Sequence, residues 1–549
     1  MALLLRSAGR TEIARSLYRD IYNENDFYYF FVGRTTEWDS EESPEDPVDS
    51  VRYANTSSRN MLFVKRIQAS DTVLMITRIN WVYGDVYDQY DDKYGEAIDE
   101  ETVYTATSGA RSLKDAQFYV LTDDDHVYKC IFNNDGADST VKPTGTSTSA
   151  IETADGYIWK FMFKVEASDK IKFLTPEYIP VRKIAGSGNP EFDVNGQIDT
   201  ITITNTGSSY ETAPTVIING DGVGAVATAI LGTGPDAGEV TSISLTSRGE
   251  GYSFAYITFS GGGGTGAAAS VSLGATETGT VQEDVENAAI PGTIDRLEII
   301  SGGIDYVDGD AIVAIVGDGS GAEAILDINP DDGSIVSVTI TNRGSGYTFA
   351  DVTIAGVEGT GAEIIAVISP RAGHGANAQK ELFATNVGFS VNLVNDSADL
   401  FLNNDFRQIG VIKNPLEFDS NNNFGLITGT CCYVIQVLDP QNYALDDVIT
   451  TDSGGKFIVI QKVDADGDGL EESIYLLPII PLITTSSIMT NVNQSIPNLV
   501  INTDVSVDVE ALAVPEIDNT TGEIIYLDNR EFIVRQQDQV EKIRAILKF

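Results

Sequence analysis

The sequence predicts a mainly β protein in which a body with few helices is interrupted by a Gly-rich β-repeat domain and a second β insert. Three observations support this fold class. Short runs in which apolar and polar residues alternate recur along the chain, and Asp, Gly, Asn and Pro separate them. Residues 196–369 hold 30 of the 51 glycines and repeat one motif four times. The 549 residues are 42% hydrophobic, which is enough for several domains that each bury a core.

The body begins with the one helix that we predict, over residues 11–22. Its apolar residues Ile13, Leu17 and Ile21 recur on one face. Thr11 precedes them and is the expected N-cap, because a threonine side chain can accept a hydrogen bond from a free N–H at the start of a helix.

Short strands separated by turns are expected in the rest of the body. They are the runs FYYFFVG, FYVLT, HVYKCIF, YIWKFMFKV, FSVNLV and IGVI. Residues 37–47 are acidic and contain proline, so we predict a loop there. Aromatic side chains gather in residues 28–31, 81–90 and 157–163. We interpret them as core and sheet packing, and the alternative is a patch that docks a partner.

Charge divides the chain into a body and two acidic inserts. Residues 196–369 contain no lysine and three arginines (Arg248, Arg296 and Arg343) against 23 acidic residues, and residues 416–520 contain two lysines against 16. These segments carry −34 of the formal net charge of −46, and the other 270 residues carry −12. We therefore predict a body made of residues 1–195, 370–415 and 521–549, interrupted by a repeat region at 196–369 and a second β insert at 416–520.

The repeat region consists of four units of about 41 residues. Each unit contains an alternating run, a tyrosine, a second run and a Gly-x-Gly-Ala motif; the aligned tyrosines are Tyr210, Tyr252, Tyr306 and Tyr347. Their separations of 42, 54 and 41 residues indicate two tandem pairs split by an acidic linker at residues 277–292. Each unit is expected to form three short strands with its tyrosine capping the core, so that a pair closes a small sandwich. The pattern leaves open whether the four units form one barrel or two sandwiches.

Two details of a unit can be predicted more closely. A strand is expected at Thr215–Ile218, and a glycine turn at Asn342–Gly344. The Gly-rich stretches at residues 220–224 and 317–321 superficially resemble a phosphate-binding loop. No Lys-Ser/Thr pair or helix follows them, and an aspartate stands where phosphate would lie. We interpret them as tight turns.

Composition excludes several classes of function. A net charge of −46 repels phosphate, which argues against nucleic acid and anionic membranes as partners. The three cysteines (Cys130, Cys431 and Cys432) suit neither a disulfide framework nor a zinc site, and we expect the two histidines (His126 and His374) to be structural or solvated. No nucleophile or metalloprotease motif is present, so we expect no enzyme activity. The N-terminus lacks the apolar region of a signal peptide, and residues 474–483 are too short to span a membrane.

One acidic loop has the spacing of a metal site. Asp464, Asp466 and Asp468 occupy positions one, three and five of a calcium loop, with Gly467–Gly469 around them. The glutamate that should close such a loop is replaced by Tyr475. We predict a hairpin turn, and a weak calcium site is the alternative; no other cofactor is expected.

Seventeen residues spread along the body, in the same order, resemble one family. They are Gly33, Arg34, Trp38, Trp81, Asp155, Gly156, Tyr157, Trp159, Phe406, Arg407, Gln408, Asn414, Pro415, Gly522, Tyr526, Asn529 and Arg530. The segments that contain them are similar to the baseplate wedge subunit of T-even-like contractile phage tails, the subunit that forms a homodimer within each wedge. The resemblance covers the 270-residue body and skips both inserts.

The resemblance implies a layered β-sandwich body with helices in side loops. It also implies a homodimer that contacts other wedge proteins, performs no catalysis, and resides in the tail baseplate of the virion after synthesis in the host cytoplasm. The alternative is a virion adhesin whose β-repeats bind host glycans, since tandem β units can present binding loops.

Overall fold

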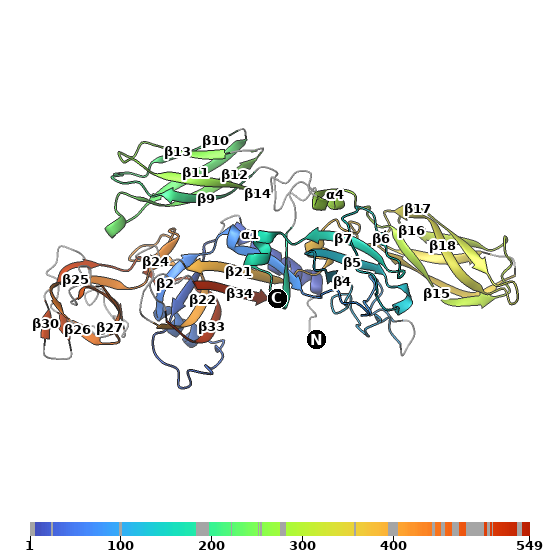
Figure 1. The fold of residues 1–549 in the computed structure, drawn as a ribbon, viewed down its shortest axis with the longest axis horizontal. Helices are drawn as coiled ribbons and strands as arrows, with labels where there is room; N and C mark the ends of the chain where they lie inside the picture. The colour runs from blue at the N-terminus through green and yellow to red at the C-terminus, as the bar shows by residue number, and fades with distance from the viewer. Residues whose placement is uncertain are drawn as a thin grey trace.

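The structure is a computed structural model in which a central body carries three further β modules (Figure 1). It describes residues 6–22, 26–97, 102–182, 197–220, 222–250, 252, 255–274, 281–355, 358–393, 405–441, 445–451, 456–463, 471–478, 499–501, 505–507, 509–534 and 541–549. Strands dominate these residues. The helices are α1 (Ser7–Tyr22), α2 (Val51–Arg59), α3 (Ala167–Lys172), α4 (Val281–Asn287) and α5 (Ala378–Glu381). The prediction of a mainly β protein with few helices is confirmed.

Helix α1 exists, but it starts earlier than predicted and only part of its predicted apolar face is buried. It begins at Ser7, so Thr11 lies inside the helix and the N-cap prediction is wrong. Of the predicted apolar face, Ile21 is buried and Leu17 packs against the core, whereas Ile13 is 43% exposed. Ala14 and Arg15 are also buried. Helix α1 packs against two strands of the body, β3 (Thr72–Thr77) and β21 (Asn386–Leu393), and contacts α5. These neighbours determine which side of the helix is covered.

The first sheet of the body joins segments from both ends of the chain. Its strands follow the order β24-β2-β1-β22-β33. Their bounds are β1 Tyr28–Gly33, β2 Met61–Arg66, β22 Asp405–Lys413, β24 Thr428–Thr430 and β33 Glu523–Val534. Every residue of β1 is buried, which explains its unbroken apolar run. Gly410 lies opposite Phe31, and a Cβ at Gly410 would stand 2.4 Å from the Phe31 ring.

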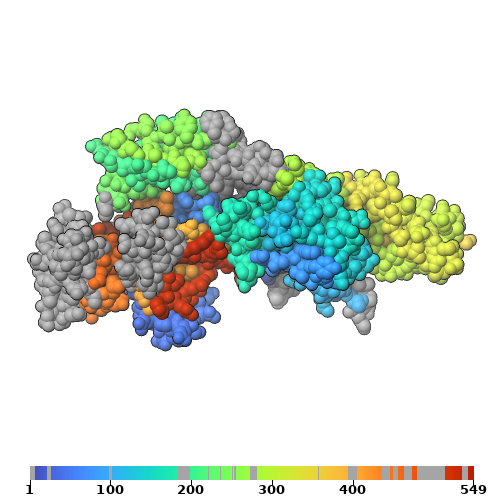
Figure 2. All heavy atoms as spheres, viewed as in Figure 1, coloured from blue at the N-terminus to red at the C-terminus, as the bar shows by residue number. Residues whose placement is uncertain are grey.

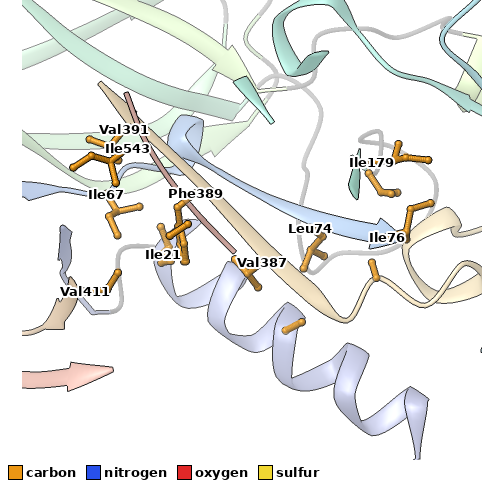
Figure 3. Close-up of a cluster of buried hydrophobic side chains, with 14 of the residues drawn as sticks. Ile21, Ile67, Leu74, Ile76, Ile179, Val387, Phe389, Val391, Val411 and Ile543 are labelled. Carbon is orange, nitrogen blue, oxygen red and sulfur yellow. The ribbon is translucent and has the colours of Figure 1, made fainter. Parts of the chain in front are cut away.

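A second sheet packs against the first and forms the layered body. Its order is β34-β21-β3-β8. The bounds are β3 Thr72–Thr77, β8 Tyr178–Val181, β21 Asn386–Leu393 and β34 Glu541–Lys548. Phe30 of the first sheet meets Phe389 of the second edge-to-face, with ring centroids 5.9 Å apart. Figure 3 shows the side chains of this core between the sheet and α1, among them Leu74 and Val387.

A third sheet completes the body and has an aromatic core. Its order is β4-β5-β7-β6, with β4 Tyr119–Leu121, β5 His126–Phe132, β6 Ile151–Glu152 and β7 Ile158–Lys164. Tyr128, Tyr157 and Trp159 are fully buried in it, together with Tyr87. The interpretation of these aromatic residues as core is confirmed. Tyr83, in the loop of residues 82–86, is exposed.

The four repeat units form two separate sandwiches of two units each (Figure 1). The first contains β9 Gln197–Asn205, β10 Thr215–Gly220, β11 Val223–Leu231, β12 Val240–Glu250, β13 Ala255–Ser260 and β14 Ala268–Gly274. The second contains β15 Ile294–Ile304, β16 Ile312–Gly317, β17 Ser320–Ile328, β18 Ile335–Ser345, β19 Ala350–Ala355 and β20 Thr360–Ile368. Each unit has three strands, as predicted, and the four tyrosines are buried.

The two units of a sandwich exchange strands. The third strand of each unit pairs with the first strand of the other, as in β15 with β20 and β17 with β18, and the middle strands β16 and β19 pair with each other. The first sandwich repeats these pairings. One unit alone therefore leaves its strand edges open, which explains why the units occur in pairs.

Most local details of the repeats are confirmed. The predicted turn at residues 220–224 includes Asp221, which lies outside the described residues. A strand covers Thr215–Ile218, and a tight turn joins β16 to β17 at Asp318 and Gly319. The predicted turn at Asn342–Gly344 is wrong, because β18 continues through these residues to Ser345. Gly344 has a φ of +59° within this strand, and Gly321 across from it has a φ of +82°.

The linker between the two sandwiches returns to the body. Helix α4 packs on β7, and its Val285 is buried against the aromatic core of the third sheet. Gln282 Nε2 donates to the carbonyl of Arg182 at 3.0 Å. The second sandwich adjoins the third sheet, and the space-filling view shows it extending from that end of the body (Figure 2).

The second insert forms its own seven-stranded sheet of order β30-β29-β26-β27-β28-β25-β31. The strands are β25 Tyr433–Gln441, β26 Val448–Thr451, β27 Lys456–Val463, β28 Glu471–Pro478, β29 Leu499–Ile501, β30 Val505–Val507 and β31 Val509–Ala513. The short strands β23 (Leu416–Glu417) and β32 (Ile517–Asp518) pair where the insert leaves the body. Both insert strands expected from the sequence are present. The exact domain boundaries stay a prediction.

Candidate functional site

The structure places the 17 residues of the family resemblance in three clusters, with Phe406 buried beside them in the body core. The first, which we term the loop clamp, contains Gly33, Arg34, Trp38, Arg407, Gln408, Asn529 and Arg530. The second, the hairpin base, contains Asn414, Pro415, Gly522 and Tyr526. The third, the aromatic turn, contains Trp81, Asp155, Gly156, Tyr157 and Trp159. Each cluster holds loops in place.

The loop clamp begins where β1 ends. Arg34 has a φ of +58°, which turns the chain out of the sheet, and its guanidinium lies 3.5 Å from the centre of the Trp38 ring. The same guanidinium donates to the carbonyls of Thr36 and Glu37 at 3.0 and 3.1 Å. Trp38 Nε1 donates to the carbonyl of Arg530 on β33 at 2.9 Å. The loop after β1 is thereby fixed to a strand almost 500 residues later.

Arg407 on β22 is the buried centre of the clamp. Its Nη1 donates to the carbonyl of Thr35 at 2.6 Å, and its Nε donates to Glu41 Oε1 at 2.7 Å. Asp405 Oδ2 lies 2.7 Å from Nη2. Burial disfavours the charge of Arg407, but the hydrogen bonds that Arg407 donates to Asp405 and Glu41 outweigh burial and raise the pKa of Arg407. The guanidinium is therefore charged and satisfied on several sides.

Gln408 and Asn529 hold the far end of the same loop. Gln408 Nε2 donates to Asn529 Oδ1 at 2.7 Å, across the register that pairs the two residues. Asn529 Nδ2 then donates to the carbonyl of Glu45 and to the hydroxyl of Tyr53, both at 2.6 Å. The predicted acidic loop of residues 37–47 is thus anchored at both ends, and the clamp presents its exposed carboxylates in one fixed arrangement.

The hairpin base secures the segment that leads into the second insert. Asn414 Oδ1 accepts from the N–H of Phe27 at 2.7 Å, and Asn414 Nδ2 donates to Asp26 Oδ1 at 2.6 Å. Hydrogen bonds from Lys413 and then Asn414 lower the pKa of Asp26. Gly522 has a φ of +75°, and a Cβ there would approach Pro415 within 3.0 Å. This close approach explains the glycine at that position.

The aromatic turn is a packed core element with a capped loop. Asp155 Oδ2 accepts from the N–H groups of Thr140 and Val141, both at 2.8 Å. Burial opposes ionisation of Asp155, but these and its other hydrogen bonds lower its pKa overall. The rings of Tyr157 and Trp159 stack at 5.4 Å with an interplanar angle of 14°. Trp81 Nε1 donates to Ser139 Oγ at 3.1 Å.

A further cluster, which the sequence did not single out, joins the second sandwich to the body. Arg296 Nη2 lies 2.6 Å from the buried Asp91, and its Nη1 donates to the carbonyls of Tyr90 and Ile131 at 2.7 and 3.2 Å. Aligning the four units offered a signal, because Arg296 stands where the other units have Thr200, Ser242 and Ser337. A long cation in a position that is otherwise small and polar indicates a contact outside the repeat.

His374 belongs to the same joint and is a largely buried histidine. Its Nε2 lies 2.6 Å from Asp295 Oδ2, and its ring meets Tyr90 edge-to-face at 4.9 Å. Burial lowers the pKa of His374, and the neighbouring charge of Lys129 acts in the same direction. Lys129 is itself buried against Glu381. The other histidine, His126, is half-buried with Nδ1 3.2 Å from the hydroxyl of Tyr128.

The structure tests some metal and membrane expectations. Across the described residues, no group of three His, Cys, Asp or Glu side chains could hold a metal ion. Asp464, Asp466 and Asp468 lie outside the described residues, so the calcium alternative there stays a prediction. The three cysteines are buried and free, and burial raises the pKa of their thiols. No helix in the part of the chain that the structure describes is long and apolar enough to cross a membrane.

Comparison with known proteins gives one finding of similarity. The chain is 29% identical over 204 residues to the baseplate wedge protein gp8 of Enterobacteria phage T4. This match covers 32% of the present chain and 60% of the relative, so the chain spans less than two thirds of the protein it resembles. No family model matches. The chain is therefore similar to a phage baseplate protein over part of its length.

Proposed function

We propose that this chain is a structural subunit of the baseplate wedge of a contractile phage tail. In this proposal it acts as a homodimer, bridges neighbouring wedge proteins and takes part in assembly and in the rearrangement on contraction. The similarity to a baseplate wedge protein is the observation that carries the proposal. The proposal places the chain in the virion and assigns it no catalysis.

The loop clamp supports a role in presenting surfaces to partners. Its buried guanidinium and amides hold an acidic loop in one arrangement, so little conformational entropy is lost when a partner binds. Within each cluster, the polar side chains bond mainly to backbone groups and to other residues of the same cluster. Such internal bonding is expected of a structural subunit. An interaction surface built this way is rigid before assembly and can change partners on contraction.

The acidic repeat sandwiches fit the periphery of such an assembly. Residues 196–369 carry 23 acidic residues and three arginines, and like charge on outward surfaces limits unwanted aggregation. Density for the assembled wedge that placed the repeats inside the dimer would contradict this part of the proposal.

Labelling of intact particles tests the baseplate role. A tag at the N-terminus of the chain, detected by gold in electron micrographs of purified virions, is expected at the baseplate. Label confined to the sheath, the head or the fibres would contradict the proposal. Light scattering of the purified chain tests the homodimer, with an expected mass of about 118 kDa, twice the 59.0 kDa of one chain. That mass should not change with a calcium chelator.

A glycan-binding adhesin is the second candidate, and one feature of the first sandwich favours it. Tyr256 is 55% exposed and lies opposite Asn219, whose Nδ2 donates to Thr258 Oγ1 at 2.9 Å. An exposed ring beside an amide can stack on and bond a sugar. Binding of the full chain to a glycan array that is lost in Tyr256→Ala would support this candidate, and an array without signal would remove it.

A further inference from the structure

The outer face of β34 carries a basic patch, which is unusual on a chain with a net charge of −46. We define the basic patch as Lys172, Lys542 and Arg544. Lys542 and Arg544 project from alternate positions of β34, and both donate to the carbonyl of Ile171 at the end of α3. Lys172 Nζ donates to the carbonyl of Ser70 at 3.0 Å. The three cations therefore gather around one short helix.

These cations are close enough to repel one another. Burial lowers the pKa of Lys542, and the charges of Arg544 and Lys172 lower it further. In the described residues their side chains hydrogen-bond to backbone carbonyls and not to carboxylates. Asp71 lies near Lys172, but it is largely buried and burial raises its pKa. The patch therefore retains positive charge that an external anion can neutralise.

The residue whose carbonyl Lys542 and Arg544 share also has an apolar side chain. Ile171 is 68% exposed, although its carbonyl is held by two cations of the patch. An exposed aliphatic group on the same surface as these charges offers the two kinds of contact found in protein interfaces, apolar and polar. The chemistry of this surface fits a carboxylate-rich protein segment that also offers an apolar side chain.

The chain itself contains such a segment in the loop that the clamp holds. Residues 37–49 contain seven acidic residues and no basic one. Glu42, Glu45 and Asp46 are exposed, and Val48 beside them is 58% exposed. Because Trp38, Arg407 and Asn529 fix this loop, its carboxylates are already ordered before binding.

We propose that the clamped acidic loop of one copy binds the basic patch of a second copy, with Val48 meeting Ile171. The inference deepens the proposed homodimer and rests on it. Two chains of charge −46 repel each other at long range, and a local region of opposite sign offsets this repulsion. Within a Debye length of about 10 Å at 0.1 M salt, loop and patch attract and set the orientation of the two copies.

Charge reversal on each side, and on both, tests this contact in the full chain. The patch variant is Lys542→Glu/Arg544→Glu and the loop variant is Glu42→Lys/Glu45→Lys. A control, Arg111→Glu/Arg371→Glu, changes the net charge as the patch variant does at two exposed arginines elsewhere. Sedimentation velocity at about 0.1 M salt gives the dimer dissociation constant of each. Circular dichroism and melting temperature identify any variant that has lost its fold.

Patch and loop variants are each expected to weaken the dimer about tenfold or more, because like charges then face each other. The combined variant should regain most of the affinity, and the control should match the wild type. If patch and loop variants both dimerise as tightly as wild type, the docking inference is wrong and the homodimer stands. If the wild type stays monomeric, both the docking inference and the proposed homodimer are wrong. The baseplate role is tested independently by gold labelling.

Discussion

The two repeat sandwiches share one internal design but are joined to the body differently. In both, an arginine of the later unit donates to the first residue of the earlier unit: Arg248 to Ile198 at 3.0 Å and Arg343 to Ile294 at 3.1 Å. Only the second sandwich places an arginine, Arg296, on its first strand, and it is this residue that reaches Asp91 of the body. Residues common to the units thus form the contacts within each sandwich. A residue that differs between units, Arg296, attaches the second sandwich to the body.

The shared design also explains the Gly-x-Gly-Ala motif. A Cβ at Gly359 would stand 2.1 Å from the ring of Tyr306, and one at Gly264 would stand 2.4 Å from the ring of Tyr210. The hydroxyls of the same tyrosines accept from the N–H groups of Ala362 and Ala267, at 3.3 and 3.4 Å. The motif therefore seats a tyrosine of one unit against the third strand of the other.

The largest expected effect comes from breaking the joint. Arg296→Ala leaves the buried Asp91 without its cation, and removing one partner of a buried pair costs about 3–5 kcal/mol. Hydrogen exchange in residues 294–298 and 364–368 should accelerate while the first sandwich keeps its protection. Ser337→Ala, at the equivalent exposed position of the fourth unit, is the control. Equal exchange in the two variants would contradict the role assigned to Arg296.

The next largest effect is expected from substitutions that destabilise one sandwich and leave the other unchanged. Gly359→Ala should destabilise the second sandwich by about 1–3 kcal/mol, because the new methyl group overpacks the Tyr306 ring. Gly264→Ala should do the same to the first sandwich alone. Gly425→Ala, where a Cβ meets only an ordinary contact at 3.5 Å, is the matched control.

Local hydrogen exchange distinguishes the outcomes of these glycine substitutions. Each alanine variant is expected to expose only its own sandwich. Loss of protection in both sandwiches from a single substitution would show that they do not unfold as independent modules.

A smaller effect should be equal in the two sandwiches. Tyr306→Phe and Tyr210→Phe each remove one hydroxyl that accepts from a backbone N–H, which costs about 0.5–1.5 kcal/mol. Hydrogen exchange measured at increasing temperature should show the same loss of stability in the affected sandwich of each variant. A shift confined to one sandwich would mean that the tyrosines act differently despite the common motif.

The smallest effect is a pH dependence limited to the second sandwich. Burial lowers the pKa of His374 below its ordinary value of 6.5, so the folded joint binds the proton less well than the unfolded chain. The contribution of neutral His374 to the free energy of unfolding is present above pH 6.5 and is lost as pH falls below that value. Asp295, Lys129, Glu381 and Tyr90 surround the ring.

Substitution of the histidine isolates its share of this dependence. His374→Gln keeps a donor for Asp295 and should reduce the loss of protection between pH 7.5 and pH 5.5, measured by exchange at the joint. An unchanged pH dependence in this variant would assign the effect to the surrounding carboxylates.

The sequence predicted the strands well and the tertiary contacts poorly. Alternation located β9 and β18, because period-two patterning reports one buried face directly. The predicted start of α1 was wrong, and its predicted apolar face was right at Leu17 and Ile21 but wrong at Ile13, which is exposed. Helix α2 was not predicted; its mean composition is polar, and Ser50 caps it through the N–H of Tyr53.

The candidate site divides in the same way. Arg34, Trp38, Arg407 and Asn529 were identified individually through the resemblance, but no pattern in the sequence showed that they meet around one loop. The joint residues Asp91, in a loop, and Lys129, within β5, gave no signal, because a single charged residue is usually solvated. Arg296 could have been found by aligning the repeat units.

The sequence by itself determined the mainly β fold, the four repeat units and their pairing, because hydrophobic period, turn glycines and tyrosine spacing are local properties. Only the tertiary structure decided that the units exchange strands, that the second sandwich is joined to the body through Arg296 and Asp91, and that three distant segments clamp one acidic loop. Those contacts join residues far apart in the sequence. Their energy depends on burial and on hydrogen bonding of charged groups, and neither property can be read from a charged residue in the sequence alone.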